Sequence, residues 1–568
     1  MEQQEQHGPI PGQPIMAPPD FPVVWENPDD ELLFWTHDAM HFPEPATLMD
    51  GAFMRTVFRR GYTRAAEAYE MPIRPRVCRI NTYLYFVMTP VMAPPEEMEA
   101  MGERSQEKLG AVMARLGDLW TNEFLPEIKQ HLDYWDGFDL HGASMPELLD
   151  HLDETISRLE RLWEIHFRLA FPFGLAPSVF EEFYRDLFGT ESAFDAYRLL
   201  QGLDNKTVET GRMLWRLSRK ALDMPEVRKV LEEDAAADVP VALEESAEGR
   251  EFLAQLRAYL DEYGQRGDMW GLSYPTWVED PTSVIKMLKD YITQPEGGPD
   301  EKLAALAAER ERLLDETYER LKGYPQAVRD QFGSLLKAAQ DATIISEDHG
   351  FWIDFHAMSR VRRVFLEFGR RFAEAGVLEQ PDDVFHLTLD ELRETAEKLP
   401  NLDRRELVAQ RTAEIEHFRA IKPPRILGTP PPGPSPDNPV SRAVEKFFGG
   451  PPRPSREPGV LQGNPGSPGI VRGQARVLRS LTEAAGLQKG EVLVAETTAP
   501  PWTPLFATAA AVVTDTGGIL SHCAVVAREY GIPAVVGTRT ATGTIKDGQT
   551  VEVDGDRGTV RILSEDGS

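Results

Sequence analysis

Thr514-Asp-Thr-Gly-Gly-Ile-Leu-Ser-His-Cys-Ala-Val-Val-Ala-Arg-Glu-Tyr-Gly-Ile-Pro-Ala-Val-Val-Gly537 is the stretch that decides the fold of the C-terminal part of the chain. The apolar run at 509–513, directly before it, predicts a buried strand that stops at Thr514. Gly517 and Gly518 allow the backbone to turn tightly, with φ values that other residues resist. A strand followed by a tight turn is therefore expected here.

A short helix is expected after this turn. Ser521 is a good N-cap, and residues 523–530 have the composition of one helix. Gly531 suits the left-handed cap that ends a helix, and Pro533 prevents its continuation. His522 is thereby placed in the first helical turn, beside unpaired backbone N–H groups, with its ring facing solvent.

The position of His522 has two chemical consequences. The positive end of the helix dipole disfavours an imidazolium ion, so the ring is expected to be neutral and nucleophilic near neutral pH. The unpaired N–H groups would stabilise a phosphoryl group carried on the ring. We interpret His522 as a catalytic nucleophile, and Ser521, Gly517 and Gly518 as the residues that shape its loop. The alternative interpretation is an ordinary surface histidine in a helix cap.

This stretch resembles the phosphohistidine signature of the PEP-utilising enzymes, which include PEP synthase, pyruvate phosphate dikinase, rifampin phosphotransferase and phenylphosphate synthase. In that family the histidine aligned with His522 takes a phosphoryl group, and a swivelling domain carries it between two distant sites. Further elements of that domain are similar to the segments 463–469, 472–478, 498–504 and 547–555. Many PEP synthases carry an Arg where this chain has Thr516, which weighs against PEP chemistry but not against phosphohistidine chemistry.

Composition narrows the class of protein. A length of 568 residues suggests two to four domains. The formal net charge of −31 and the pI near 4.9 argue against nucleic acid or an anionic membrane as a partner. The two cysteines, Cys78 and Cys523, indicate no disulfide framework and a reducing compartment. The N-terminus lacks the features of a signal peptide and there is no membrane-spanning apolar run, so we expect a cytoplasmic protein.

The expected fold is multidomain: a mainly α-helical substrate domain followed by an α/β swivelling phosphohistidine domain. Four regions are expected: a disordered N-terminal tail at 1–20, the helical domain at 21–422, a Pro/Gly-rich linker at 423–458, and the swivelling domain at 459–568. A proline-rich tether is semi-rigid and extends roughly 3 Å per residue, so the linker could move a domain by tens of ångströms, as phosphoryl shuttling requires.

Within the helical domain, apolar residues recur three or four positions apart from residue 95 to about residue 340. Breaks between successive helices are expected at Pro172, at Pro275 and near Pro299, and a strand is expected over 80–86. The βα alternation of a barrel is missing. That barrel binds PEP in PEP synthase and the dikinase, so its absence argues against PEP as the substrate.

A second informative segment is Ile345-Ser-Glu-Asp-His-Gly-Phe-Trp-Ile-Asp-Phe-His356, which is expected to continue as a long helix to about Ala375. On an α-helix, Glu347 and Asp354 share one stripe, whereas His349 lies on another with His356 and Arg360. The segment resembles the "EDH.F..D" region of the rifampin phosphotransferase-like domain. Polar groups that pair with one another to fix helix packing are the alternative interpretation.

Two further segments resemble parts of the same helical domain. Residues 34–48 collect His37, Asp38, His41 and Glu44 among aromatic residues and prolines, although a rigid turn would explain this equally well. Arg266, in a "YG.R" segment, could face a phosphoryl group, although a lone arginine is more often a surface or ion-pair residue.

We predict a dikinase-type phosphotransferase that carries the β-phosphoryl group of ATP on His522 and transfers it to a hydroxyl or phenolic small molecule. The candidate catalytic residues are His522, Ser521, Gly517, Gly518, His349, Glu347 and Asp348, with His37 a further candidate base. The candidate acceptor-binding residues are Trp35, His37, His41, Tyr85, Arg266, Trp352 and Arg360, and Arg363 is a further candidate cation. No residue is assigned as a metal ligand.

The resemblance also implies a partner. Rifampin phosphotransferase combines an ATP-grasp domain with a helical domain and a His domain, and this chain is similar to the last two. Phenylphosphate synthase divides these functions between polypeptides. ATP and Mg²⁺ are therefore expected on a separate ATP-grasp subunit. The alternatives are a PEP-dependent phosphocarrier and a non-catalytic regulatory protein that retains the swivelling domain.

Overall fold

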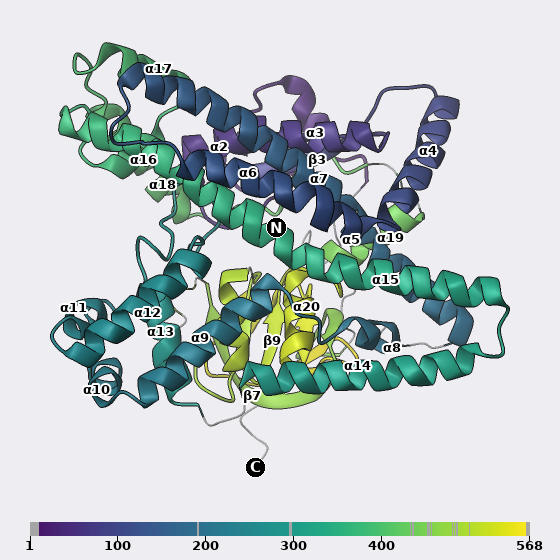
Figure 1. Cartoon of the computed structure of the whole chain (residues 1–568). Coiled ribbons are helices and arrows are strands. Elements are labelled where there is room, and N and C mark those ends of the chain that lie inside the picture. Colours follow the sequence, from purple (N-terminus) through teal and green to yellow (C-terminus); the bar gives the residue numbers. More distant parts are fainter. Residues whose placement is uncertain are drawn as a thin grey trace.

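The computed structural model describes residues 11–189, 192, 194–294, 298–431, 433, 437–450, 455, 457–479, 481, 483, 487–498 and 500–563. Figure 1 shows a large helical part and, below it, a sheet domain formed by the C-terminal residues, with α9, α14 and α15 around that domain. The predicted fold class, a helical region followed by an α/β domain, is confirmed. Within the described ranges, the search for a helix with the length and apolar character of a membrane span finds none.

The helical part contains a small antiparallel sheet with the strand order β2-β3-β1-β4. Its strands are β1 (Phe34–His37), β2 (Ile73–Ile80), β3 (Tyr83–Pro90) and β4 (Ile426–Gly428). The strand expected over 80–86 is confirmed for residues 83–86 of β3, but Ile80 belongs to β2, because Asn81 and Thr82 both have positive φ and form the tight turn between β2 and β3.

Helices make up most of the rest of this part. The α-helices are α2 (Leu48–Phe53), α3 (Arg59–Ala68), α4 (Pro95–Met113), α5 (Leu116–Leu119), α6 (Leu125–Asp136), α7 (Met145–Phe188), α8 (Phe194–Tyr197), α9 (Lys206–Leu222), α10 (Pro225–Glu233), α11 (Val239–Leu243), α12 (Ala247–Tyr263), α13 (Thr282–Ile292), α14 (Pro299–Leu321), α15 (Gln326–His349), α16 (Met358–Glu374), α17 (Leu389–Lys398), α18 (Arg405–Arg419) and α19 (Pro439–Phe448). The 3₁₀ and π segments are η1 (Pro28–Leu32), η2 (Met54–Phe58), η3 (Trp120–Phe124), η4 (Arg198–Leu200), η5 (Gly350–Ala357) and η6 (Pro381–His386).

The longest helix, α7, contradicts one expected break. It runs for 44 residues with Pro172 and Pro177 inside it. A proline inside a helix removes one backbone hydrogen bond, and packing can offset that loss. Both prolines are buried, and Phe173 lies in the main helical core. The helix therefore passes through a position at which its own sequence predicts an end.

The C-terminal domain is an eight-stranded sheet in the order β5-β12-β11-β7-β8-β9-β10-β6, in which β7, β8, β9 and β10 run parallel. Separate apolar clusters pack around it, one of which includes α20. Its elements are β5 (Val460–Gln462), β6 (Asn464–Ser467), β7 (Ile470–Leu478), β8 (Val492–Ala495), η8 (Pro500–Ala507), β9 (Ala511–Thr514), α20 (His522–Tyr530), β10 (Ala534–Val536), α21 (Ala541–Thr544), β11 (Thr550–Asp554) and β12 (Thr559–Ile562).

The segment expected to be an open linker is partly ordered. Its strand β4 pairs with β1, and its helix α19 packs on α7. The tail expected to be disordered also differs in part: Gly12 and Ile15 donate backbone hydrogen bonds to the carbonyl oxygens of Pro430 and Gly428. Residues 1–10 lie outside the described residues. The four predicted domain boundaries stay predictions.

Candidate functional site around His522

The loop between β9 and α20 brings His522 to the helical part. Gly517 has φ +102, a conformation that L side chains rarely adopt. A Cβ at Gly518 would collide with the backbone of Glu445 and Lys446, so this glycine allows α19 to lie directly on the loop. Ser521 caps α20 through the backbone N–H of Ala524, and His522 is its first residue, as predicted.

The ring of His522 does not face solvent, contrary to the expectation from the sequence. Its side chain is only 16% exposed, because Glu347 of α15 lies against it. The Nδ1 atom of His522 is 3.3 Å from Oε2 of Glu347, and the Nε2 atom is 3.5 Å from the hydroxyl oxygen of Thr503. The histidine of one domain thus meets a carboxylate of the other.

Glu347 is held for this contact by a second bond. Thr207, near the start of α9, donates its hydroxyl to Oε2 of Glu347 at 2.7 Å. Burial raises the pKa of Glu347, but His522 and the Thr207 hydroxyl lower it by more, and the net shift is downward. A carboxylate beside Nδ1 favours the tautomer with the proton on Nδ1, which leaves the lone pair on Nε2 for a nucleophilic role.

Arg266 is a buried cation within electrostatic reach of Glu347. The residue is 2% exposed, and its Nε and Nη2 atoms have no hydrogen-bond partner among the described residues. Its guanidinium lies 4.5 Å from the ring centre of Phe355. Burial lowers the pKa of Arg266 to about 10, so it remains charged at neutral pH. Unpaired buried donors are costly, so a site for an anion is the simplest explanation.

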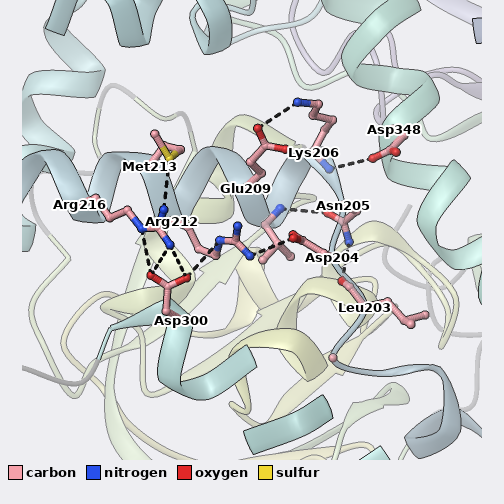
Figure 2. A network of polar contacts seen from close by, with 12 residues as sticks. Leu203, Asp204, Asn205, Lys206, Glu209, Arg212, Met213, Arg216, Asp300 and Asp348 are labelled. Atoms are coloured by element: carbon pink, nitrogen blue, oxygen red, sulfur yellow. Dashed lines mark hydrogen bonds and ion pairs between the residues drawn. The ribbon is translucent and has the colours of Figure 1, made fainter. Parts of the chain in front are cut away.

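Asp348 points toward the start of α9 (Figure 2). Its Oδ1 atom accepts the backbone N–H of Lys206 at 2.8 Å. Burial raises the pKa of Asp348 to about 6, although this hydrogen bond opposes the shift. Farther along α9, Figure 2 shows Arg212 and Arg216 converging on Asp300. Asp348 therefore contributes to the attachment of α9 to α15.

His349 approaches Asp354 and His166 of α7. This differs from the predicted helical stripes, which separated His349 from Asp354. The reason is that η5 is π-helical, with bonds between residues five apart, so the two side chains fall on one face. Burial lowers the pKa of His349 to about 4 and keeps its ring neutral.

His41 approaches the same region from the N-terminal segment. Its Nδ1 atom pairs with Asp38 at 2.8 Å, and its ring lies 5.0 Å from that of Trp270. Burial lowers the pKa of His41, but Asp38 and then Asp354 raise it by more, and the net shift is upward. The electrostatic effect of Asp354 indicates that this predicted acceptor residue lies near the His349 cluster.

Three other residues predicted to bind the acceptor or act as a base belong to a separate core with β1 and β3. Trp35 donates to the carbonyl of Asp30, and Tyr85 donates to that of Pro424. His37 contacts the ring of Tyr85, and burial lowers the pKa of His37 to about 4. The structure places these residues in a packed core rather than beside His522.

The predicted residues Trp352 and Arg360 also lie apart from His522. Lys129 lies over the ring of Trp352 at 5.1 Å. Arg360 pairs with Asp136 at 2.7 Å, and so does Arg363. Both arginines therefore fasten α16 to the end of α6.

The C-terminal sheet domain contacts the helical part at further points. Leu520, two residues before His522, lies in a core formed mainly by the helical part. Glu529 of α20 accepts the backbone N–H of Gly202 at 3.0 Å. Lys446 of α19 pairs with Glu181 of α7 at 2.6 Å, and its carbonyl accepts the N–H of Leu520. The linker helix thus holds the His522 loop against α7.

Sequence reasoning did not assign four residues at or near this site: Thr207, Thr503, His166 and Trp270. Thr207 and Thr503 lie inside segments that resemble the family, but nothing in the sequence links them to His522. His166 and Trp270 each stand among apolar or aromatic residues that suggest ordinary packing. Only the tertiary structure brings these residues to the site.

Two known families match the chain. Residues 166–347 match the family described as "Rifampicin phosphotransferase fourth domain", and residues 487–558 match "PEP-utilising enzyme, mobile domain". These ranges cover Thr207, Arg266 and Glu347 in the first case and His522 in the second. The contact between His522 and Glu347 therefore joins the two matched regions.

Three relatives illustrate the similarity. Chondramide synthase cmdD of Chondromyces crocatus is 43% identical over 97% of this chain and 14% of that protein. The uncharacterised phosphotransferase YvkC of Bacillus subtilis is 31% identical over 71% of this chain and 47% of its own length. The rifampicin phosphotransferase of Streptomyces sviceus is 30% identical over 84% of this chain and 51% of its own length.

The chain thus spans about half or less of the length of these relatives. The two family matches and the named phosphotransferases confirm the resemblance found in the sequence. The chain is similar to the PEP-utilising enzymes, with a region that matches their mobile domain beside a region that matches the rifampicin phosphotransferase fourth domain.

Proposed function

We propose that the chain is the phosphoryl-carrying and acceptor-binding part of an ATP-dependent phosphotransferase of the dikinase type. The observation that carries the proposal is the contact of His522 with Glu347 across the two domains. The names of the relatives support the enzyme class, because several are phosphotransferases. Two parts of the proposal go beyond the names of the relatives: that ATP binds on a separate unit, and that the acceptor carries a hydroxyl or phenolic group.

The reaction takes place in two transfers. First, Nε2 of His522 attacks the β-phosphorus of ATP, which is held with Mg²⁺ on a separate ATP-grasp unit; an N–P bond forms, the bond to the α-phosphate oxygen breaks, and AMP leaves. Water then cleaves the bond between the β- and γ-phosphoryl groups, which releases inorganic phosphate and leaves the β-phosphoryl group on Nε2. Second, the swivelling domain docks on the helical part, and an acceptor oxygen attacks the phosphorus. The Nε2–P bond breaks, its electron pair returns to the ring, and the acceptor proton passes to a base. The candidate base near His522 is Glu347.

Positioning and charge neutralisation account for most catalysis of phosphoryl transfer. The first turn of α20 presents backbone N–H groups to a phosphoryl group on His522. Arg266 supplies unpartnered guanidinium donors on the side of Glu347. Glu347 itself holds the ring through Nδ1. These groups act on the phosphoryl group from both domains only when the domains are docked.

The acceptor is proposed to be a small molecule with an alcoholic or phenolic hydroxyl group. A cavity lined by Arg266, Trp270, Tyr274, Asp354 and Met358, among others, lies beside the site and combines aromatic surface with a cation. Its volume of about 20 Å³ has room for about one water molecule. A drug-sized acceptor needs at least about 300 Å³, so binding requires the helices to separate there or the swivelling domain to move.

The ATP proposal is tested by labelling. The 568-residue chain is incubated with β-³²P-labelled ATP and Mg²⁺, with and without an ATP-grasp partner. We expect acid-labile, base-stable label on the chain only when the partner is present. Onward transfer is assayed with phenol and with rifampicin as acceptors. Self-labelling of the chain without the partner would contradict the proposed division of labour.

A further inference from the structure

His166, His349 and Asp354 form a cluster beside the phosphoryl-transfer site but outside the contacts of His522. His166 comes from the middle of α7, His349 ends α15, and Asp354 lies in the π-helical segment η5. Their donor atoms all lie within 4.8 Å of one another. In the part of the chain that the structure describes, this is the one group of three such side chains gathered closely enough to hold a metal ion.

Among the described residues, the hydrogen bonds of the cluster engage only one nitrogen of each histidine, so the other nitrogen can bind a metal ion. Nδ1 of His349 lies 2.9 Å from the carbonyl oxygen of Ile345. A carbonyl oxygen only accepts, so Nδ1 carries the proton and Nε2 keeps its lone pair. Nδ1 of His166 lies 3.0 Å from Oδ1 of Asp354. A histidine fixed by a backbone carbonyl through one nitrogen, with the other free, is typical of metal-binding histidines.

We propose that His166, His349 and Asp354 bind one divalent transition-metal ion of the Zn²⁺ class. Two imidazoles and one carboxylate suit Zn²⁺ or Fe²⁺, whereas Mg²⁺ prefers oxygen ligands. Three protein ligands leave at least one coordination position for water or another oxygen ligand, as in catalytic zinc sites.

The geometry and surroundings fit such an ion. In a tetrahedral site with bonds of about 2.1 Å the ligand atoms lie about 3.4 Å apart, so atoms within 4.8 Å of one another need to close by about 1.4 Å at most. The side chains of His166 and Asp354 are 12% and 19% exposed, which leaves a path for an ion. The ring of His166 lies 4.5 Å from that of Trp163, and the ring of His349 lies 4.8 Å from that of Phe173. Aromatic packing thus limits the motion of both histidines.

The π-helical register of η5 explains how the ligand set forms. In an α-helix, residues five apart point in different directions, whereas η5 places His349 and Asp354 on one face. Isolated π turns inside longer helices are rare and occur mostly at functional sites. The π-helical register of η5 therefore brings His349 and Asp354 together as ligands.

The test is metal binding by the untagged full-length chain, which does not depend on the acceptor or on ATP. After treatment with a chelator, the protein is titrated with Zn²⁺ by calorimetry, and with Co²⁺ as a spectroscopic probe. We expect one ion per chain and visible Co²⁺ absorption typical of mixed nitrogen and oxygen ligands. Excess Mg²⁺ is not expected to displace the ion. A wild-type chain that binds no Zn²⁺ in the micromolar range would overturn the proposal.

Variants locate the ion. Asp354→Asn keeps the size of the side chain, and His166→Asn removes one imidazole; each is expected to weaken Zn²⁺ binding at least about 100-fold and to abolish the Co²⁺ absorption. The matched control is His141→Ala, because His141 is 79% exposed and lies outside the cluster. Thermal melting shows whether each variant folds, and Zn²⁺ is expected to raise the Tm of the wild type and of the control only. Unchanged binding in either folded cluster variant would contradict the assignment.

Discussion

The variant His522→Ala is expected to lower phosphoryl transfer to the acceptor by at least about 1,000-fold, because it removes the only proposed carrier of the phosphoryl group. The fold is expected to survive. Ser521 still caps α20, and Thr207 still donates to Glu347 when the ring is gone. A loss of about 1 kcal/mol moves the Tm of a domain of about 100 residues by about 4–8 °C.

The measurement combines steady-state transfer in the presence of the ATP-grasp partner with a thermal melt of each protein. His417→Ala is the matched control, since His417 is exposed on α18. We expect wild-type transfer from this control and none above background from His522→Ala. Transfer by a folded His522→Ala variant at a rate near that of the wild type would rule out the phosphohistidine mechanism.

Arg266→Met is expected to lower the rate of transfer from phosphorylated His522 by about 100- to 1,000-fold, the effect of removing one preorganised donor from a developing negative charge. Stability is expected to stay the same or rise. The reason is that Nε and Nη2 of Arg266 have no hydrogen-bond partner, so methionine removes a buried cation without breaking a described hydrogen bond of these atoms.

Single-turnover transfer from the labelled chain separates this effect from loading of the histidine. Arg360→Met is the matched control, because Arg360 is held by Asp136 and is expected to be silent in transfer. A loss of stability in Arg266→Met without a loss of transfer would show that Arg266 only supports the fold. Equal losses of transfer in Arg266→Met and Arg360→Met would contradict a specific role of Arg266 in transfer.

The local structure around His522 could be predicted because its signals lie close together in the sequence. Ser521 caps the helix, Gly531 adopts φ +62 at its end, and the strand β9 precedes the loop, all as the sequence indicates. Each of these depends on neighbouring residues and little on distant ones. The long helix through residue 347 to about residue 375 was predicted for the same reason.

Features that depend on tertiary contacts were not predicted. α7 continues through Pro172 because its neighbours pack around it. The strand β4 lies inside the proline-rich segment and forms only because β1 offers an edge. The π turn of η5 moves Asp354 toward His349, which a regular helical wheel cannot show. Glu347 was named as a candidate, but its contact with His522 joins residues 175 positions apart.

Among the residues predicted to bind the acceptor, some lie near His522 and Glu347 and others do not. Trp35 and Tyr85 are among the residues predicted to bind the acceptor, and both lie in a packed core. Arg266 was selected with the reservation that lone arginines are usually surface or ion-pair residues, and it is buried with unpartnered donors. Composition identifies residues that can bind a ligand, whereas unsatisfied hydrogen bonds identify those with a partner still to be found.

The most direct measurement of the central claim follows the phosphoryl group itself. The chain is labelled on His522 by the ATP-grasp partner, freed of ATP and partner, and mixed with an accepted hydroxyl compound in a rapid-quench experiment. We expect acid-labile label to leave Nε2 of His522 at the rate at which the phosphorylated acceptor appears, with total label conserved. Label that stays on His522 while product forms from ATP, or label on another residue, would contradict transfer through His522.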